Sequence, residues 1–407
     1  MNHEALVLGV GSTRFGRLDH SAGDLAGLAA YEALRDAGLT PADVGAVFHA
    51  TVSQKAIDGQ HMIPGQVALR PHGFAGVPVV NVENACAGGA TALWLAIAHV
   101  RAGLSDVALA VGVDKLVCAD PAQGLAVFDG AMDVAHREGT LAALAALADP
   151  LPPELSVDGD RSVFMEIYAS LARAHMQRFG TTEAHLAAVS AKNHAHSVHN
   201  PRAHFRRPFT ADEVLAARRV AWPLTVPMCS PVSDGAAAAV VTRADFPHDD
   251  SAVAVLSSVL LSGTDRAADD AEHHIGRRAA LAAYEKAGLG PQDVDVAEVH
   301  DATAFGEIQQ AENLGFCPIG DGGPWSLSGA SALGGTLPVN PSGGLESRGH
   351  PVSATGLAQV FELVTQLRSR ACGRQVPDAR IAIAENGGGL YGIEEAVAAV
   401  TILGRTR

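Results

Sequence analysis

A cysteine among very small residues and a distant histidine are the two side chains of this 407-residue chain that best fit covalent catalysis. Cys86 lies in the segment 85–89, whose other members are all Ala or Gly and leave room for a ligand beside the sulfur. A thiol becomes a strong nucleophile when a base such as imidazole removes its proton, and His350 is a candidate for that base. The spacing therefore predicts a nucleophilic cysteine. The alternative that the local sequence leaves open is a buried structural thiol.

The elements that must position these two residues show an internal duplication. Residues 86–93 resemble residues 350–357, and each copy begins an amphipathic helix that runs to about residue 100 or 367. Residues 37–44 likewise return as residues 287–294, each closing a helix with Gly and leading into a strand. If the copies pack about a pseudo-twofold axis, the two helix N-termini converge. We then expect the helix dipole to lower the pKa of the thiol, and His350 to accept its proton.

The alternation of strands and helices predicts an α/β fold made of two similar layered halves. One half covers residues 1–245 and the other residues 246–407, with residues 107–111 and 381–384 as corresponding buried strands. The stretch 115–220 has no counterpart in the second half, so it is interpreted as an inserted loop region. It carries an acidic segment over residues 149–161 and a helix over residues 163–179. Insertions of this kind often contribute ligand contacts.

Several motifs in order along the chain are similar to those of the thiolase superfamily. Residues 82–89 resemble its nucleophile turn, and residues 340–356 resemble its catalytic-histidine motif. Residues 299–302 stand where thiolases of the sterol-carrier-protein type carry a His-Asp-Cys-Phe motif, and residues 230–238 resemble the segment that closes the first half. Sterol-carrier-protein-type thiolases and thiolase-like acetyltransferase subunits are the closest in motif. The resemblance implies a duplicated, five-layered αβαβα fold that is usually dimeric or tetrameric.

The resemblance also implies roles for three side chains. Cys86 would accept the acyl group of an acyl-coenzyme A thioester. His350 would deprotonate Cys86 and help to stabilise an oxyanion, and His300 would orient a water or donate to a second oxyanion. The predicted activity is that of an acyltransferase that moves an acyl group, with acetyl favoured, to a carbon nucleophile.

Two further predictions follow from the same motifs. Backbone N–H groups of Cys86 and of Gly387 or Gly388 would form the oxyanion hole, a kind of donor set worth about 3–4 kcal/mol per donor in the transition state. Ser230 falls where family members contact the pantetheine arm of coenzyme A.

The sequence departs from the family at the second catalytic thiol. Residues 384–389, where thiolases carry a Cys-x-Gly motif, contain no Cys, and Ala302 occupies the alternative position. Three explanations remain open. The acceptor is already a good carbon nucleophile, such as a phenolic ring, or Glu385 serves as acid/base if burial raises its pKa towards neutrality. The third is that condensation chemistry has been lost.

Two other functions stay open at this point. One is a carbon–carbon lyase of the thiolase-like retro-aldolase type, and the other is a non-catalytic acyl-CoA-binding subunit of a complex. Related retro-aldolases carry Tyr at the positions that match His300 and His350, so the two histidines weigh against a lyase.

Composition restricts the partners. The formal net charge of −15 argues against nucleic acid or an anionic membrane, and no apolar run approaches the roughly 18 residues of a membrane span. The first residues lack the features of a signal peptide, and five scattered cysteines without a C-x-x-C pair fit a reducing compartment, so a cytoplasmic protein is expected. We expect a homodimer or tetramer, as in the family, and some relatives also work with a small zinc-ribbon/OB-fold subunit.

No metal and no permanently bound cofactor is expected, since coenzyme A enters as a thioester substrate. The histidines at 194, 196, 199 and 204 are interpreted as a solvated or hydrogen-bonded run in a loop rather than as metal ligands. His49 ends a strand at the position that corresponds to His300, and a structural role is favoured for it over a place in the cleft.

Overall fold

A computed structural model describes residues 5–157 and 162–406 of the chain. The strands are β1 (Ala5–Ser12), β2 (Ala46–Ala50), β3 (Val79–Val82), β4 (Val107–Asp114), β5 (Arg219–Ala221), β6 (Leu224–Thr225), β7 (Gly235–Arg243), β8 (Val253–Ser262), β9 (Val296–Glu298), β10 (Ile381–Gly388) and β11 (Val397–Arg405). The helices are α1 (Ala22–Asp36), α2 (Ser53–Ile57), α3 (Pro64–Leu69), α4 (Gly88–Arg101), α5 (Pro121–Ala126), α6 (Arg137–Ala145), α7 (Val163–Phe179), α8 (Glu183–Ser197), α9 (Ala211–Ala216), α10 (Ile275–Ala287), α11 (Ala304–Asn313), α12 (Gly322–Leu327) and α13 (Thr355–Leu367).

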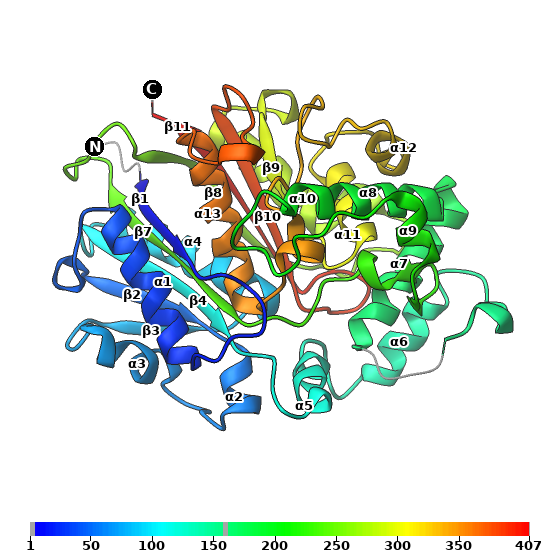
Figure 1. The fold of residues 1–407 in the computed structure, drawn as a ribbon, viewed down its shortest axis with the longest axis horizontal. Helices are drawn as coiled ribbons and strands as arrows, with labels where there is room; N and C mark the ends of the chain where they lie inside the picture. The colour runs from blue at the N-terminus through cyan, green and yellow to red at the C-terminus, as the bar shows by residue number, and fades with distance from the viewer. Residues whose placement is uncertain (1–4, 158–161, 407) are drawn as a thin grey trace.

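Within the described residues, one large mixed sheet has the strand order β3-β2-β4-β7-β1-β8-β11-β10-β9 (Figure 1). The first five strands in this order come from the first part of the chain and the last four from the second part. Antiparallel pairing of β1 with β8 joins the two groups. The sheet therefore consists of two similar halves that meet along one pair of strands.

The two groups of strands enclose the central helices α4 and α13, and apolar side chains of both groups and both helices form one buried cluster. Helix α1 packs on the outer face of the first group, and α10 packs on the outer face of the second. Helix, strands, central helices, strands and helix thus make five layers. This arrangement confirms the predicted duplicated αβαβα fold.

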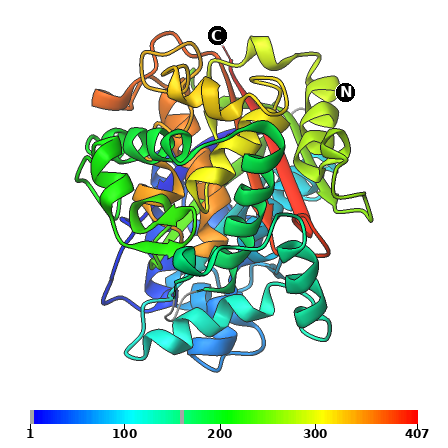
Figure 2. The ribbon, with the colours of Figure 1, turned by 90° about the vertical axis from the view of Figure 1, so that its right-hand side faces the viewer.

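The stretch 115–220 folds into helices α5 to α9, and α6 to α9 gather on the side of the molecule that faces the viewer in Figure 2. Helix α7 has the predicted bounds. Its N-cap Ser162 accepts a hydrogen bond from the N–H of Phe164, and Gly180 ends it in the left-handed conformation with φ of 77°. Residues 158–161 of the predicted acidic segment lie outside the described residues.

The expectation of a loop around residues 194–204 is wrong for its first part. Helix α8 continues to Ser197, and a capping box between Thr182 and His185 begins it. His194 and His196 are buried, and they bond to the carbonyl oxygens of residues 227 and 340 at 3.1 and 3.0 Å. Asn193 and Ser197 suggested a loop, but Asn193 donates to Asp301 and Ser197 accepts from Ser347, and such tertiary contacts favour the helix. Within the described part of the chain, no helix is both long and apolar enough to cross a membrane.

Candidate active site

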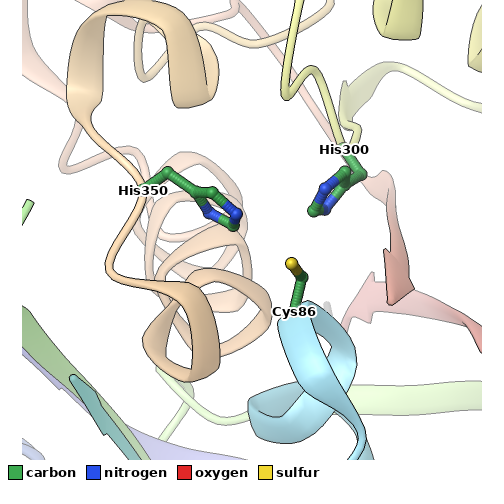
Figure 3. Close-up of side chains that lie close together, drawn as sticks. All are labelled: Cys86, His300 and His350. Atoms are coloured by element: carbon green, nitrogen blue, oxygen red, sulfur yellow. The ribbon is translucent and has the colours of Figure 1, made fainter. Parts of the chain in front are cut away.

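The structure brings together the three side chains that the sequence singled out. The Cys86 sulfur and one ring nitrogen each of His300 and His350 all lie within 4.8 Å of one another. Figure 3 shows the sulfur pointing into the gap between the two imidazoles. The rings themselves are edge to face, with centroids 5.3 Å apart and planes at 86°. A thiol between two imidazoles is an arrangement that supports nucleophilic catalysis.

Cys86 sits in a tight turn between β3 and α4. Residues Ala85–Ala87 form a 3₁₀ turn, and α4 begins two residues after the cysteine. Ala85 has φ of 47°, a left-handed conformation that costs a residue with a Cβ about 1 kcal/mol or more. The Glu83 carboxylate accepts a hydrogen bond from the N–H of Ala85 at 2.7 Å and holds this turn in place. The turn presents the sulfur at the N-terminal end of α4.

Glycines allow the two corresponding helix starts to approach each other closely. A Cβ on Gly89 would lie 2.4 Å from the carbonyl oxygen of Ser353, and a Cβ on Gly356 would lie 2.8 Å from the backbone nitrogen of Ala90. Any larger residue would push α4 and α13 apart. The small residues around Cys86 therefore serve helix packing as well as access to the sulfur.

Residues 230–233, near the end of the first half, contact both the loop that carries His300 and the loop that carries His350. The backbone N–H of His350 donates to Ser233 Oγ at 3.3 Å, and the backbone N–H of Ser230 donates to the carbonyl oxygen of Ala302 at 3.0 Å. In the imidazole ring of His350, Nδ1 forms a hydrogen bond with Thr355 Oγ1 at 2.7 Å, and Nε2 is therefore free to face the thiol. These contacts fix the plane of the imidazole before substrate arrives.

Hydrogen bonds also define which nitrogen of His300 carries its proton. The side-chain amide of Asn386 donates to His300 Nδ1 at 2.7 Å and to the carbonyl oxygen of Gly387 at 3.3 Å. Because both bonds need the amide nitrogen to be a donor, Nδ1 accepts and the proton of the neutral ring lies on Nε2. His300 thus presents an N–H to the site, as a hydrogen-bond donor rather than as a base.

The thiol is neutral in the resting site, contrary to the expectation of a lowered pKa. Burial, with a smaller contribution from the charge of Asp114, raises the pKa of Cys86 to about 12. Burial also holds the pKa of His300 at about 4, and burial with the neighbouring His300 holds the pKa of His350 well below its usual value. Desolvation outweighs the helix dipole here, since the sulfur is enclosed on most sides. The resting site is a neutral thiol–imidazole pair.

A cavity of about 990 Å³ opens in front of the three residues and is also lined by Ser230. Much of its wall is apolar and comes from the insertion and from the segment after β10: Met132, Phe164, Met165, Tyr168 and Leu390. Lys55 and Arg218 add positive charge to the lining of a protein that is otherwise strongly acidic. The insertion therefore shapes the ligand pocket, as the sequence suggested.

Residues 387–389, at the end of β10, all line this cavity. The predicted donors Gly387 and Gly388 are among them, but the backbone N–H groups that act on the Cys86 thiol are those of Gly389 and of Cys86 itself. A Cβ on Gly388 would lie 2.5 Å from the carbonyl oxygen of Asn84, so the strand packs directly on the nucleophile turn. Gly389 is a further candidate donor that the motif did not single out.

Glu385 and His49 do not line the cavity in the described structure. One carboxylate oxygen of Glu385 accepts the backbone N–H of His300 at 3.0 Å, so the residue positions the His300 loop. This placement does not support the predicted acid/base role. His49 is fully buried on β2, which agrees with the structural interpretation.

Several residues around the site were missed by the sequence reasoning: Thr355, Asn386, Gly389, Tyr168 and Glu395. Asn386 and Gly389 lie in a segment that had been noted for its missing cysteine, so a signal for them existed. Nothing local distinguishes Tyr168 or Glu395 from ordinary helix and loop residues. In the described part of the chain, Cys86, His300 and His350 also form the one His/Cys/carboxylate group compact enough to hold a metal ion, with two nitrogens and one sulfur that suit zinc.

Comparison with known families and proteins shows the family to which the chain belongs. Residues 6–245 match the family described as "Thiolase, N-terminal domain", and residues 264–405 match "Thiolase C-terminal domain-like". The chain is 37% identical over 411 residues to "Acetyl-CoA acetyltransferase" of Methanothermobacter thermautotrophicus, covering 99% of this chain and all of that protein. It is 34% identical to "Sterol carrier protein 2" of Bos taurus, over 95% of this chain and 70% of that one.

A third relative is "Benzoylsuccinyl-CoA thiolase subunit BbsB" of Thauera aromatica, 33% identical over 96% of each chain. Among solved structures, "Ltp2-ChsH2(DUF35) aldolase" superposes with a TM-score of 0.78 at 23% identity, over all of this chain and 98% of that chain. Human mitochondrial 3-ketoacyl-CoA thiolase superposes with a TM-score of 0.69 at 17% identity, over 99% of each chain. At these identities the two structures establish a shared fold.

Proposed function

The chain belongs to the thiolase family and is an acyltransferase, and we propose that it moves an acyl group from acyl-coenzyme A, through a thioester on Cys86, to a carbon nucleophile. The observation that carries this proposal is the convergence of Cys86, His300 and His350 in one cavity. Acetyl is the favoured acyl group.

In the first half-reaction, His350 Nε2 takes the proton of the Cys86 thiol as the sulfur attacks the thioester carbonyl. A carbon–sulfur bond forms to Cys86, the bond to coenzyme A breaks, and the leaving thiolate takes the proton from His350. Because thiol and imidazole are both neutral at rest, this proton moves only when an electrophile is bound. The N–H groups of Cys86, Gly387, Gly388 and Gly389 are the backbone donors for the developing oxyanion.

In the second half-reaction, a carbon nucleophile attacks the acyl group on Cys86 and the sulfur leaves as the new carbon–carbon bond forms. The Nε2–H of His300 donates to the oxyanion of this step, and Asn386 keeps that proton on Nε2. The charge develops beside a fixed donor that needs no reorganisation.

The shape and charge of the cavity support a coenzyme A thioester as substrate. A volume of about 990 Å³ is at the upper end of the usual range for small-molecule sites, enough for an acyl-pantetheine arm and an acceptor together. Lys55 and Arg218 supply positive charge for the coenzyme's phosphates, and Ser230 lies where the pantetheine arm would pass. No resident cofactor is needed, because the acyl group enters already activated.

Two surface features support assembly into a homodimer or tetramer. Strand β3 is an edge of the sheet, and unpaired edge strands readily accept another strand. Beside it, the exposed side chains of Met62, Ile63, Val67 and Val80 leave apolar surface open to solvent. The name of the BbsB relative, a thiolase subunit, supports a partner protein as well, and a small zinc-ribbon/OB-fold subunit is the form we propose. The free thiols fit the reducing conditions of the cytoplasm.

The experiment is intact-protein mass spectrometry after brief incubation with a panel of acyl-CoA esters. Wild-type protein should gain the mass of one acyl group from its preferred donor, and Cys86→Ser should gain none. Cys372→Ser, which changes an exposed thiol, is the matched control and should acylate like the wild type. Binding without an adduct for any donor would refute the acyl-enzyme. A carbon–carbon lyase that needs no acyl-enzyme would retain activity in Cys86→Ser.

A further inference from the structure

The second half-reaction needs a base if the attacking carbon must first lose a proton, and the two histidines do not supply one. His350 Nε2 is unprotonated again after the first half-reaction, but it is directed at the Cys86 sulfur rather than at a separate acceptor carbon. His300 presents an N–H rather than a lone pair. Three carboxylates line the cavity within the described residues: Glu83, Asp133 and Glu395. Glu83 is exposed, and Asp133 pairs with a largely exposed histidine at the surface, whereas the side chain of Glu395 is only 13% exposed.

One hydrogen bond and one close imidazole contact hold the side chain of Glu395 in place. Gln310 Nε2 donates to Oε1 at 3.1 Å, and His274 Nε2 lies 3.3 Å from Oε2. The backbone N–H of Gly276 donates to His274 Nδ1 at 3.1 Å, so the proton of the neutral ring must lie on Nε2, facing Glu395. Gln310 and His274 therefore orient the carboxyl group of Glu395 through both of its oxygens.

A third side chain aligns both donors. Asn313 Nδ2 donates to His274 Nδ1 at 3.0 Å and to Gln310 Oε1 at 2.9 Å. Gln310 therefore turns its amide nitrogen, and His274 its Nε2, towards Glu395. His274, at the N-cap of α10, and Gln310 of α11 contact Glu395, and the residue also lines the cavity. A carboxyl group fixed in this way is positioned to act as a base.

The position of Glu395 relative to Cys86 suits proton removal from an acceptor carbon. A Cβ on Gly387 would lie 2.8 Å from Glu395 Cγ and 3.2 Å from Oε1, so the carboxylate rests on the Gly387 peptide. Gly389, two residues further on, donates its N–H to the Cys86 sulfur. Glu395 and Cys86 therefore both lie beside the C-terminal end of β10, and both line the same cavity.

We propose that Glu395 is the general base of the second half-reaction, which removes a proton from the carbon α to a thioester of the acceptor. This inference rests on the proposed acyl transfer. Glu395 Oε takes the proton as the carbon–hydrogen bond breaks, and the resulting enolate attacks the acyl carbon on Cys86. The carbon–carbon bond forms, the carbon–sulfur bond to Cys86 breaks, and the proton on Glu395 returns to the leaving thiolate through the cavity. The acceptor is thus a thioester with an α C–H, such as a second acyl-CoA.

Glu385 is the alternative base and provides the matched comparison. It lies behind the cavity wall, and burial together with the charge of Glu395 raises its pKa to about 8, so it is mostly protonated at neutral pH. A protonated carboxyl without contact to the cavity is poorly placed to remove a proton from substrate.

The test measures exchange of the acetyl-CoA methyl hydrogens with deuterium in D₂O, followed by mass spectrometry of the coenzyme A ester. Wild type, Glu395→Gln and Glu385→Gln are compared, and Cys86 acylation is measured in the same samples. Glu395→Gln should exchange at least about 100-fold more slowly than wild type, with acylation within about threefold, because a positioned base contributes about 10²–10⁴-fold. Glu385→Gln keeps a side-chain oxygen that can accept the backbone N–H of His300, so it should retain exchange.

Each other outcome overturns a specific statement. Exchange at the wild-type rate in Glu395→Gln removes the base role from Glu395, and loss of exchange in Glu385→Gln alone moves it to Glu385. A wild type that acylates Cys86 but exchanges no methyl hydrogen shows that no base acts at an α-carbon. A wild type with no acylation refutes the proposed acyl transfer itself. Unfolding temperatures of the variants separate a chemical effect from a folding defect.

Discussion

The sharpest prediction concerns how the reactivity of the Cys86 thiol depends on pH. The pKa of about 12, against an ordinary value of 9.0, corresponds to about 4 kcal/mol in favour of the neutral thiol. At pH 8 about one molecule in ten thousand then carries a thiolate, compared with about one in ten for an unperturbed thiol of that ordinary value. Because only the thiolate is alkylated, its rate should follow this fraction.

The assay is alkylation of the substrate-free protein with iodoacetamide at pH 6–10, with each cysteine quantified by peptide mapping. The rate at Cys86 should be low at pH 7 and rise about tenfold per pH unit up to pH 10, without a plateau. Exposed Cys372 reports in the same samples that the reagent remains active.

A plateau in the Cys86 rate below pH 7 would refute the reasoning. It would mean that a thiolate–imidazolium pair forms with His350 in the resting protein and that the helix dipole outweighs desolvation. A steep rise up to pH 10, together with rapid acylation at pH 7.5, would show that the proton moves to His350 only when an acyl-CoA is bound.

Three further predictions concern packing, the proton on His300, and acid stability. Gly89→Ala places a Cβ 2.4 Å from the carbonyl oxygen of Ser353. It should lower the free energy of unfolding by about 1–3 kcal/mol in urea titrations and slow Cys86 acylation. Unchanged stability would contradict the close approach of the two helices. Asn386→Leu removes the donor to His300 Nδ1, so it should slow the complete reaction by up to about 10²–10³-fold while Cys86 acylation changes little. Equal losses in both half-reactions would argue against a donor role for His300. His49 has a folded-state pKa of about 4, below its unfolded value near 6.5, so the unfolded chain binds the extra proton and stability falls as pH drops from 6.5 to 4. His49→Leu should remove about 3 kcal/mol of that fall, and identical pH profiles of unfolding for both proteins would show that His49 is not the group responsible.

The comparison of sequence with structure separates features that depend on short segments from those that depend on packing. The bounds of α7 follow from Ser162 as N-cap and Gly180 as C-cap, which act within a turn of the helix. The loop expected near His194 is a helix in the structure, because His194 and His196 make buried contacts to residues 227 and 340, which are far away in the chain.

The same distinction applies to the site. The small residues beside Cys86 and the duplicated segment around His350 were sufficient to predict that the two residues meet, because the chemistry and the helix starts are local patterns. Glu395 gave no such signal, since the residues that contact it, Gln310, His274 and Gly387, come from separate parts of the chain.

By itself, the sequence determined the thiolase fold, the duplication, and the choice of Cys86, His300 and His350 as the candidate reactive set. These depend on residue types and spacings that any copy of the motif must retain. Only the tertiary structure decided that Cys86 is a neutral thiol, that His300 donates through Nε2, and that Glu395 rather than Glu385 faces the cavity. Desolvation and hydrogen-bond partners set those properties, and both arise only when distant segments pack against one another.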